Sequence, residues 1–275
     1  MTIQPILTLR RSLEKDKHVW EDLGDLDPLW AVSSFPEYRF RKWDTGQFFK
    51  TGDEEISRVM QACLQMGYPK GTECVLDFGC GVGRCTRALA KYFKQCYGVD
   101  VSENMIAKAN ELNSSISNCT FTVNYEADLR IFSDDYFDMI YSTDVLQHIP
   151  STPLIRNYIS EFLRILKAGG ILVFQLPHSI PLLYKAGLGS RIYNMLRTLG
   201  FNKQFIYQNL GKLGLRPYRM NFIPENEVVA FLIGIGGKVL EVKNDSAAGP
   251  SAQTRTYYPR RTYYVTKSVE QEPKV

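Results

Sequence analysis

The residues best suited to chemistry in this 275-residue chain are Asp77 and three glycines that follow it, Gly79, Gly81 and Gly83. Glycine has no Cβ and adopts positive φ readily, so a backbone rich in it can turn sharply and lie against a ligand. Free amide N–H groups are expected where such a turn leads into a helix. Asp77 adds a carboxylate that could hold a cationic amine, directly or through water. The pattern predicts a binding corner for a nucleotide-like ligand.

Other interpretations of the glycines give different expectations. The dinucleotide fingerprint G-x-G-x-x-G needs its third glycine at position 84, where this chain has Arg84. The P-loop pattern needs G-K-[ST] after the turn, and that triplet is absent. A glycine turn that merely connects a strand to a helix stays open as the structural alternative.

Two strands must bring the reactive groups together. The apolar run 74–78 predicts a buried strand and 84–93 a helix, which places the glycines between them. A second buried strand is predicted at 95–100 and ends at Asp100. An acidic residue at that position can accept hydrogen bonds from both hydroxyls of a ribose. Ser102 is the expected N-cap of the helix that follows.

Three patterns together resemble the class I S-adenosylmethionine-dependent methyltransferases. They are D-x-G-x-G-x-G at 77–83, G-x-D-x-S-x-x-M at 98–105 and L-x-P-G-G at 166–170. Ala168 stands where the third pattern usually has proline, which removes a rigidifying ring but no chemistry. The resemblance covers roughly 53–177 and 223–268, with its matched segments in the family's order.

This resemblance implies a fold and a cofactor site. The fold is α/β, a doubly wound, seven-stranded and mostly parallel sheet (Rossmann-like) whose last strand is antiparallel. The cofactor is S-adenosyl-L-methionine. In the family an acidic residue after the third strand meets the adenine amine, the next amide reaches a ring nitrogen, and the segment after the fourth strand lies under the methionine portion. The implied cofactor-binding residues are Asp77, Gly79, Cys80, Gly81, Gly83, Asp100, Val101, Asp128, Leu129 and Thr143.

The remaining elements follow from hydrophobic periodicity and turn residues. Further strands are predicted at 119–124, 137–142, 171–176, 238–243 and 262–267. Helices are predicted from Asp53, capped by Thr51 or Asp53, at 152–166 with Ala168-Gly169-Gly170 ending it, at 190–199 and at 224–235. Gly249-Pro250 is interpreted as the hairpin connection before the last strand.

His148 is the single catalytic candidate. It follows the predicted strand 137–142, and an unperturbed histidine pKa of about 6.5 suits a general base. A polar residue that only fixes the loop before Pro150 is an alternative of at least equal weight.

The chain divides into a central domain and additions. We expect an N-terminal arm at 1–52, a methyltransferase domain at 53–268 and a tail at 269–275. Residues 1–20 are expected to be loosely packed, whereas 26–52 either close over a ligand or cover apolar surface. The domain contains an insertion at 178–222, interpreted as a lid on the acceptor side. Its amphipathic helix 190–199 can lie over a pocket, rest on a membrane, or pack on the sheet for stability.

Composition narrows the class of protein. A net charge of +4 is too small to indicate a nucleic-acid partner. Six cysteines without a C-x-x-C pair and only three histidines favour reduced thiols and no metal. The chain shows no signal-peptide pattern and no apolar run of membrane-spanning length, so a cytoplasmic protein is expected.

The predicted reaction is methyl transfer to an O, N or C nucleophile of a small or amphiphilic molecule, with a mild preference for an anionic one. Peripheral membrane contact is compatible with this, and the oligomeric state and the acceptor stay open. Two alternatives remain. One is a degenerate member that binds the cofactor, or nothing, as a scaffold, which the acidic residues Asp77, Asp100 and Asp128 disfavour. The other is a dinucleotide oxidoreductase, which Arg84 disfavours.

Overall fold

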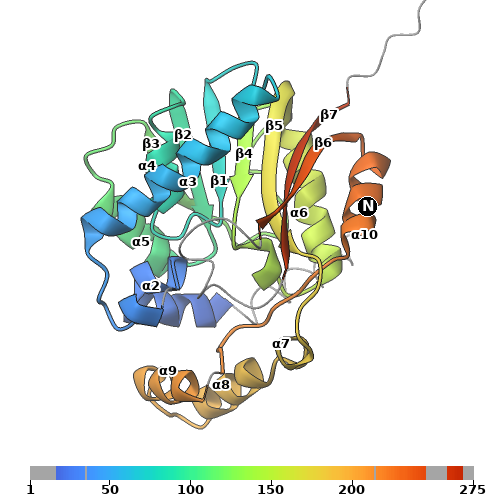
Figure 1. Ribbon diagram of the computed structural model, residues 1–275. Coiled ribbons are helices and arrows are strands. Elements are labelled where there is room, and N and C mark those ends of the chain that lie inside the picture. The colour runs from blue at the N-terminus through green and yellow to red at the C-terminus, as the bar shows by residue number, and fades with distance from the viewer. Residues whose placement is uncertain (1–16, 35, 214, 246–258, 269–275) are drawn as a thin grey trace, which may run out of the picture.

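Seven strands form one sheet at the centre of the molecule (Figure 1). The computed structural model describes residues 17–34, 36–213, 215–245 and 259–268. The strand order is β3-β2-β1-β4-β5-β7-β6, and β7 pairs antiparallel with both of its neighbours. This confirms the predicted fold class. The strands are β1 (Cys74–Phe78), β2 (Gln95–Asp100), β3 (Cys119–Val123), β4 (Phe137–Ser142), β5 (Leu166–Pro177), β6 (Gly237–Asn244) and β7 (Arg260–Lys267).

The order of the strands determines where a ligand can bind. The chain runs outward from β1 to β2 and β3, and then returns to place β4 on the other side of β1. In open α/β sheets the crevice at such a reversal lies beyond the carboxyl ends of the strands. The carboxyl ends of β1, β2 and β4 are therefore the expected location of the site.

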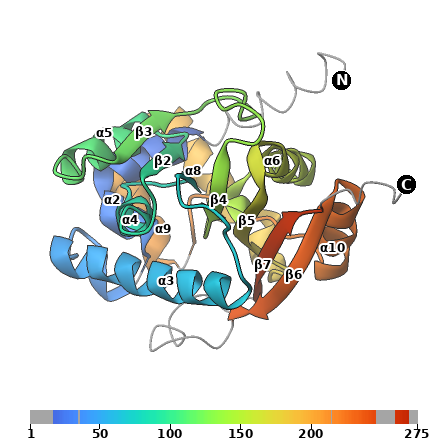
Figure 2. The ribbon, with the colours of Figure 1, turned by 90° about the horizontal axis from the view of Figure 1, so that it is seen from above.

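Helices cover both faces of the sheet, as the view from above shows (Figure 2). On one face α3 (Thr45–Gln65) and α4 (Arg84–Leu89) pack with residues such as Val75, Met139 and Val173. On the other, α6 (Thr152–Ile165) and α10 (Glu225–Gly234) pack with Leu76, Ile140 and the strand partners around them. Alternate residues of the same strands thus face opposite cores, so the central strands are apolar throughout.

Several element boundaries differ from the predictions. Helix α3 begins at Thr45 and not near Asp53, because the Asp44 carboxylate accepts from the Gln47 amide and caps it there. Helix α4 ends at Leu89, before the predicted 93. Strand β5 begins at Leu166, which pairs with Phe137 of β4. The Ala168-Gly169-Gly170 segment is therefore part of a strand and does not terminate the preceding helix.

The N-terminal region is more ordered than expected. Residues 17–26 are helical, and Val19 is buried. Helix α2 (Pro28–Val32), the turn η1 (Pro36–Tyr38) and Trp43 follow and pack in the same apolar cluster. The expectation of loose packing is wrong for 17–20, because this helix buries apolar side chains; residues 1–16 lie outside the described part of the chain. The predicted turn at Gly249-Pro250 also lies outside it.

The insertion 178–222 contains three helices, of which only one was predicted. They are α7 (Leu182–Ala186), α8 (Leu188–Thr198) and α9 (Lys203–Lys212). Outside the insertion, helix α5 (Glu103–Leu112) follows β2 and the short 3-10 helix η2 (Leu146–His148) follows β4. Helix α9 escaped prediction because its apolar positions do not form a clear stripe, although Asn202 caps it by accepting from the Gln204 and Phe205 amides. No helix among the described residues is long and apolar enough to span a membrane.

The N-terminal residues and the α8–α9 hairpin form one unit, which we call the cap (residues 17–34, 36–43 and 188–213). Asp22 forms an ion pair with Arg197 of α8 at 2.9 Å and accepts from the Tyr193 hydroxyl. His18 bonds Asn194 at 2.8 Å, and Arg39 donates to the Tyr207 carbonyl at 3.2 Å. The arm and the insertion, predicted as separate features, therefore share one apolar core.

Candidate active site

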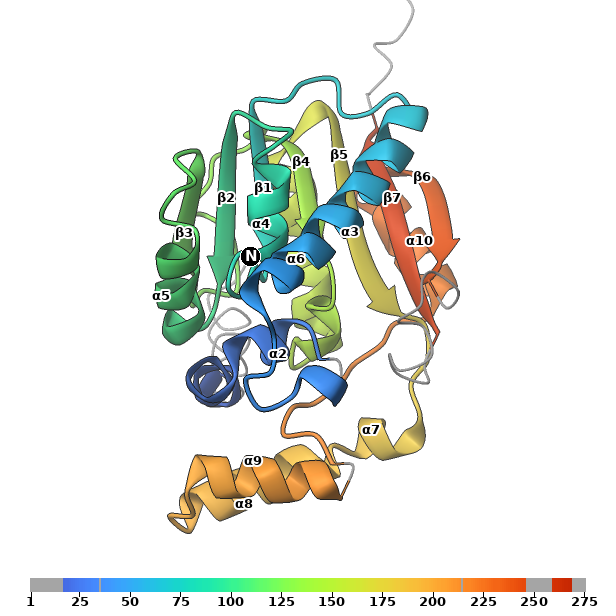
Figure 3. The same ribbon diagram turned by 60° about the vertical axis from the view of Figure 1, so that its left-hand side comes forward.

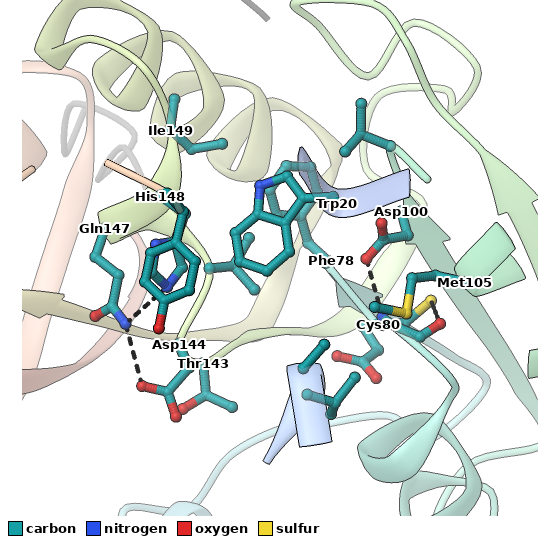
Figure 4. Close-up of a pocket in the computed structure, with 18 of the residues that line it drawn as sticks. Trp20, Phe78, Cys80, Asp100, Met105, Thr143, Asp144, Gln147, His148 and Ile149 are labelled. Carbon is teal, nitrogen blue, oxygen red and sulfur yellow. Dashed lines mark hydrogen bonds between the residues drawn. The ribbon is translucent and has the colours of Figure 1, made fainter. Parts of the chain in front are cut away.

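One pocket opens at the carboxyl ends of β1, β2 and β4, beneath the cap (Figure 4). Its lining combines most of the predicted residues with side chains from the cap and from the segment that leaves α9. The predicted residues present are Asp77, Gly79, Cys80, Gly81, Asp100, Val101, Thr143 and His148. Gly83, Asp128 and Leu129 are not among the lining residues. Gly83 is instead the N-cap residue of α4, with φ 81°, and a Cβ added there would lie 2.7 Å from the Phe121 ring.

The amides of the glycine turn are already used within the protein. Gly79 and Cys80 both donate to the Val99 carbonyl of β2, at 2.8 and 3.0 Å, and Gly81 donates to the Asp100 carboxylate at 2.9 Å. The expectation of free amides in this turn is wrong for these three residues, because the turn is closed against the neighbouring strand. What the glycines supply is space and curvature rather than an anion-binding nest.

Space is limited on both sides of the turn. Gly79 has φ 75°, and a Cβ there would lie 2.3 Å from Cγ2 of Val145. Gly81 has φ 53°, and its Cβ would lie 2.3 Å from Cγ2 of Val32 in α2. Both distances are far below van der Waals contact, so neither position can accept a side chain without movement. The sequence predicted that this backbone turns sharply and lies against a ligand; the structure adds a close neighbour from the cap.

Asp100 stands at the end of β2 and joins the glycine turn to helix α5. One carboxylate oxygen accepts from the Gly81 amide and the other from the Ser102 amide, each at 2.9 Å. A carboxylate has about four acceptor positions, so two hydrogen bonds leave capacity for ribose hydroxyls. Burial raises the pKa of Asp100, and the amide donors oppose that shift. The predicted N-cap Ser102 is confirmed by its bond from the Met105 amide at 3.2 Å.

Asp77 lies in a buried polar group under the glycine turn. Its carboxylate accepts from the Thr86 hydroxyl at 2.6 Å. Arg84 is 3% exposed and pairs with Glu55 at 2.9 Å, and Glu55 also accepts from the Tyr141 hydroxyl at 2.7 Å. The Arg84 Nε is buried without a hydrogen-bond partner among the described residues. A carboxylate and a guanidinium thus line the same end of the pocket, which suits the ammonium and carboxylate of an amino acid.

A pH profile tests the role of Asp77. Burial raises the pKa of Asp77 from 3.8 to about 6, so its carboxylate in the free protein is lost as the pH falls below that value. If it holds a cationic amine, affinity for S-adenosylhomocysteine should fall by up to about tenfold per pH unit below pH 6. Isothermal titration between pH 5 and 8 measures this. Asp77→Asn should bind weakly with a flat profile; a slope retained in that variant would show that a group other than Asp77 titrates.

The same shift has a consequence for stability. Because the folded state binds this proton more strongly than the unfolded chain, the free energy of unfolding contributed by Asp77 falls as the pH rises from about 4 to about 6. Cofactor affinity and stability of the free protein should therefore respond to pH in opposite directions over this range.

The adenine contacts predicted at Asp128 and Leu129 are placed outside the pocket. The Leu129 side chain is fully buried, and its amide donates to the Glu161 carboxylate at 2.9 Å. Asp128 lies 3.3 Å from Arg130. Asn124, directly after β3, is the polar residue of this region that lines the pocket, and its amide nitrogen donates to the Asp128 carbonyl at 2.9 Å. The backbone amide of Leu129, which was expected to reach adenine, is thus already bonded to Glu161. The adenine-binding roles of Asp128 and Leu129 stay predictions.

His148 belongs to an aromatic cluster at the other end of the pocket (Figure 4). Its ring meets Trp20 edge-on at 5.0 Å and Tyr218 at 4.7 Å, and Trp20 stacks on Tyr218 at 5.4 Å. Burial lowers the pKa of His148 to about 4, which corrects the assumption of an ordinary value. Nδ1 lies 3.2 Å from the Arg219 carbonyl, so Nδ1 carries the proton and Nε2 is an acceptor.

Thr143 and Asp144 follow β4 at the centre of the pocket. Asp144 has φ 56°, an uncommon conformation outside glycine that aspartate tolerates. Its carboxylate pairs with Arg260 at the start of β7 and accepts from Gln147 at 3.3 Å. The turn after β4 is thus tied to β7, two strands away in the sheet, which holds Thr143 and His148 in place.

Sequence reasoning missed Trp20, Val32, Arg84, Arg216 and Tyr218 as pocket residues. Arg84 directly follows the last glycine, but from the sequence it was used only as an argument against a dinucleotide site. The other four carry no local signal, because tertiary contacts such as the following two bring their segments to the pocket. Glu21, beside Trp20, accepts from the Glu103 amide at 2.7 Å, and the Asn221 amide donates to the Gln147 carbonyl at 2.7 Å.

The strand order together with this site defines a Rossmann-like methyltransferase fold, and comparison with known proteins agrees. Residues 76–174 match the family described as a methyltransferase domain. A 2-methyl-6-phytyl-1,4-hydroquinone methyltransferase of Synechocystis is 37% identical over 106 residues, which are 38% of this chain and 32% of that protein. A trans-aconitate 2-methyltransferase of Deinococcus radiodurans is 33% identical over 140 residues, 49% of each chain.

Solved structures show the same fold. An S-adenosylmethionine-dependent methyltransferase of Clostridium acetobutylicum superimposes with a TM-score of 0.55 at 17% identity, covering 87% of this chain and 98% of that one. Magnesium protoporphyrin IX methyltransferase of Synechocystis with bound SAM gives 0.54 at 17% identity, with coverages of 92% and 97%. The match at residues 76–174 identifies a methyltransferase domain in this chain, and the fold around it is that of the class I S-adenosylmethionine-dependent methyltransferases.

The family model and the curated relatives match only part of this chain. The region shared with the curated relatives spans 32% and 49% of their length, less than two thirds in both cases. The family model ends at residue 174, so it includes neither the cap nor Arg216 and Tyr218. What those relatives methylate is consequently no guide to the walls of this pocket.

Proposed function

We propose that this protein transfers a methyl group from S-adenosylmethionine to an O, N or C nucleophile of a small or amphiphilic molecule. The observation that carries the proposal is the meeting of Asp77, Asp100 and His148 in one pocket at the carboxyl ends of β1, β2 and β4. The unpartnered buried Nε of Arg84 supports the fit of the amino-acid end of the cofactor. When bound, S-adenosylmethionine supplies a methyl group already activated on a sulfonium.

Alignment is the main task left to the protein in such a reaction. Holding donor and acceptor in line can contribute about 7–11 kcal/mol to lowering the barrier. In this pocket Asp100 would hold the ribose and Asp77 the ammonium, which leaves the aromatic end of the pocket for the acceptor. At that end Trp20 of the cap stacks on Tyr218, and both rings line the pocket.

His148 is proposed to position the acceptor. With a pKa of about 4 it is neutral at physiological pH, and its Nε2 faces the Gln147 side-chain amide nitrogen at 3.3 Å. A hydroxyl or amine of the acceptor would donate to this Nε2 in place of Gln147. A group with so low a pKa retains a proton poorly near pH 7, which argues against a role as general base for a weakly acidic acceptor. To orient the acceptor by a hydrogen bond, His148 does not need to take up a proton.

The lid proposed at 178–222 is supported by its returning segment. Arg216, Tyr218 and Met220 line the pocket, and the Arg219 carbonyl fixes His148. An acceptor with an apolar or aromatic body would contact Trp20 and Tyr218, and Arg216 would favour an anionic group on it.

A titration followed by an acceptor screen tests the function. S-adenosylhomocysteine should bind in calorimetry, and NAD should not. Transfer of labelled methyl groups is then measured with hydroquinones, carboxylates and amino-alcohol phosphates as acceptors. Tyr218→Ala should reduce turnover while affinity for S-adenosylhomocysteine changes by less than about threefold. Absence of S-adenosylhomocysteine binding would refute the function, and binding without any turnover across the screen would favour the scaffold alternative.

A further inference from the structure

The insertion exposes an unusual number of large apolar side chains. Leu199, Phe205 and Leu213 are 66%, 53% and 73% exposed. Seven of the exposed large apolar residues among the described part of the chain lie within this one segment: Leu182, Leu188, Met195, Leu199, Phe201, Phe205 and Leu213. Single exposed apolar residues are ordinary, but a group of them on one element marks a contact surface.

The exposed residues of α8 lie on one side of the helix. Leu188, Arg191, Met195 and Leu199 are spaced by three, four and four residues, which places them along one stripe. The opposite side of the helix is buried in the cap through Tyr193. Helix α8 therefore has two apolar sides, and packing within this chain accounts for only one.

The turn between α8 and α9 continues this surface. Phe201 and Phe205 stack at 6.2 Å and are both exposed. The α8–α9 hairpin is the outermost layer of the molecule, with α2 lying between it and the end of the sheet (Figure 3). Nothing else in the described chain covers the stripe and the turn, which we call the outer surface (Leu188, Arg191, Met195, Leu199, Phe201 and Phe205).

The charge of the insertion is entirely of one sign. Residues 178–222 contain no Asp or Glu and seven basic residues: Lys185, Arg191, Arg197, Lys203, Lys212, Arg216 and Arg219. Arg197 and Lys203 pair with Asp22 and Asp25 inside the cap. Lys185, Arg191, Lys212 and Arg219 are exposed.

A basic, apolar surface of this kind suits one occupant best. A second copy of the chain would bring the same basic side chains against each other in a two-fold interface, which costs free energy. A bilayer with anionic headgroups offers negative charge for the cations and an apolar interior for Leu, Met and Phe.

We propose that the outer surface of the cap is a peripheral binding site for an anionic phospholipid bilayer. Met195, Leu199, Phe201 and Phe205 enter the interfacial region, and Arg191 and Lys212 contact the headgroups. The segment leaving the same hairpin reaches the pocket at Arg216 and Tyr218, so the surface lies on the acceptor side of the molecule.

Vesicle sedimentation tests the proposal without reference to methyl transfer. The full chain should sediment with vesicles of phosphatidylcholine mixed with phosphatidylglycerol and bind phosphatidylcholine alone at least about tenfold more weakly. Binding should also weaken when the salt is raised from about 0.1 M to about 1 M, since screening shortens the range of the attraction. Equal binding to both kinds of vesicle, or to neither, overturns the proposal.

Matched variants locate the surface. Leu199→Glu with Phe201→Glu should weaken binding at least about tenfold. The control, Leu64→Glu with Ile233→Glu, makes the same change at two residues that are 63% exposed on α3 and α10, and it should bind like the wild type. Arg191→Glu with Lys212→Glu is an independent loss variant, in case the first does not fold. Equal effects of the outer-surface and control variants contradict the proposal.

Sedimentation velocity distinguishes a bilayer from the other candidate partner of this surface, a second copy of the chain. A dimer that Leu199→Glu with Phe201→Glu dissociates, found without any vesicle binding, would assign the outer surface to a second copy of the chain and overturn the bilayer. A monomer that binds anionic vesicles supports it.

Discussion

Gly81→Val should abolish measurable binding of S-adenosylhomocysteine, with a loss of at least about a hundredfold, equivalent to about 2.7 kcal/mol. A side chain at φ 53° costs about 1–2 kcal/mol, and its Cβ would lie 2.3 Å from Val32. Relief requires movement of the turn away from Asp100 or of α2 away from the pocket. Both movements alter surfaces that line the site. Calorimetry on protein with a native circular dichroism spectrum measures the loss.

A double variant separates the collision from the backbone conformation. Gly81→Ala should weaken binding, and adding Val32→Ala should restore part of the affinity, because the nearest remaining atom of residue 32 is Cβ at 3.6 Å. Gly236→Ala is the control, since Gly236 has φ 84° and open space around it. It should lower stability but leave affinity unchanged. Unchanged affinity in folded Gly81→Val would remove the turn from the binding site.

Asp100→Ala should lower affinity for S-adenosylhomocysteine by at least about tenfold, and up to about ten-thousandfold. Two hydrogen bonds from ribose hydroxyls to a charged acceptor would be lost, each worth about 1.5–3 kcal/mol. The variant also frees the Gly81 and Ser102 amides, which loosens the connection between the glycine turn and α5. Calorimetry and thermal unfolding are measured together so that the two losses can be compared.

Glu21→Ala is the matched control for Asp100. The Glu21 carboxylate accepts from the amides of Glu103 and Asn104 at the start of the same helix, at 2.7 and 3.1 Å, but does not line the pocket. Its removal should lower the melting temperature with a smaller effect on affinity than Asp100→Ala. A loss below about threefold in Asp100→Ala would place the ribose elsewhere.

The cap is built from two segments far apart in the sequence, and neither lies in the region that matches the family model. The cap uses Asp22 to join α8 to the N-terminal helix and Glu21 to join that helix to α5. Replacing the whole insertion would remove Tyr207 and uncover Trp30, which packs against it, so such a change would test folding as much as substrate binding. Single substitutions at the pocket wall, such as Tyr218→Ala, separate the two.

The amino-acid sequence alone predicted the central strands and the meeting of the glycine turn with Asp100. Strands 74–78, 95–100 and 137–142 were predicted with the residues they have in the structure, because buried parallel strands are short, apolar and bounded by turn residues. Parallel neighbours align their carboxyl ends, so Gly81 and Asp100 could be expected to meet although 19 residues separate them. These strands could be predicted because each has its own apolar run and its own flanking turn residues.

Only the tertiary structure decided the aromatic end of the pocket, formed by Trp20, His148 and Tyr218. Trp20 and Tyr218 are almost two hundred residues apart and stack because the cap folds across the pocket, a contact that no periodicity encodes. The pKa of His148 depends on how completely those rings exclude water, and the position of α3 depends on a single cap at Asp44. The amides of the glycine turn proved to be bonded to Val99 and Asp100, because an adjacent strand competes with a ligand for the same donors.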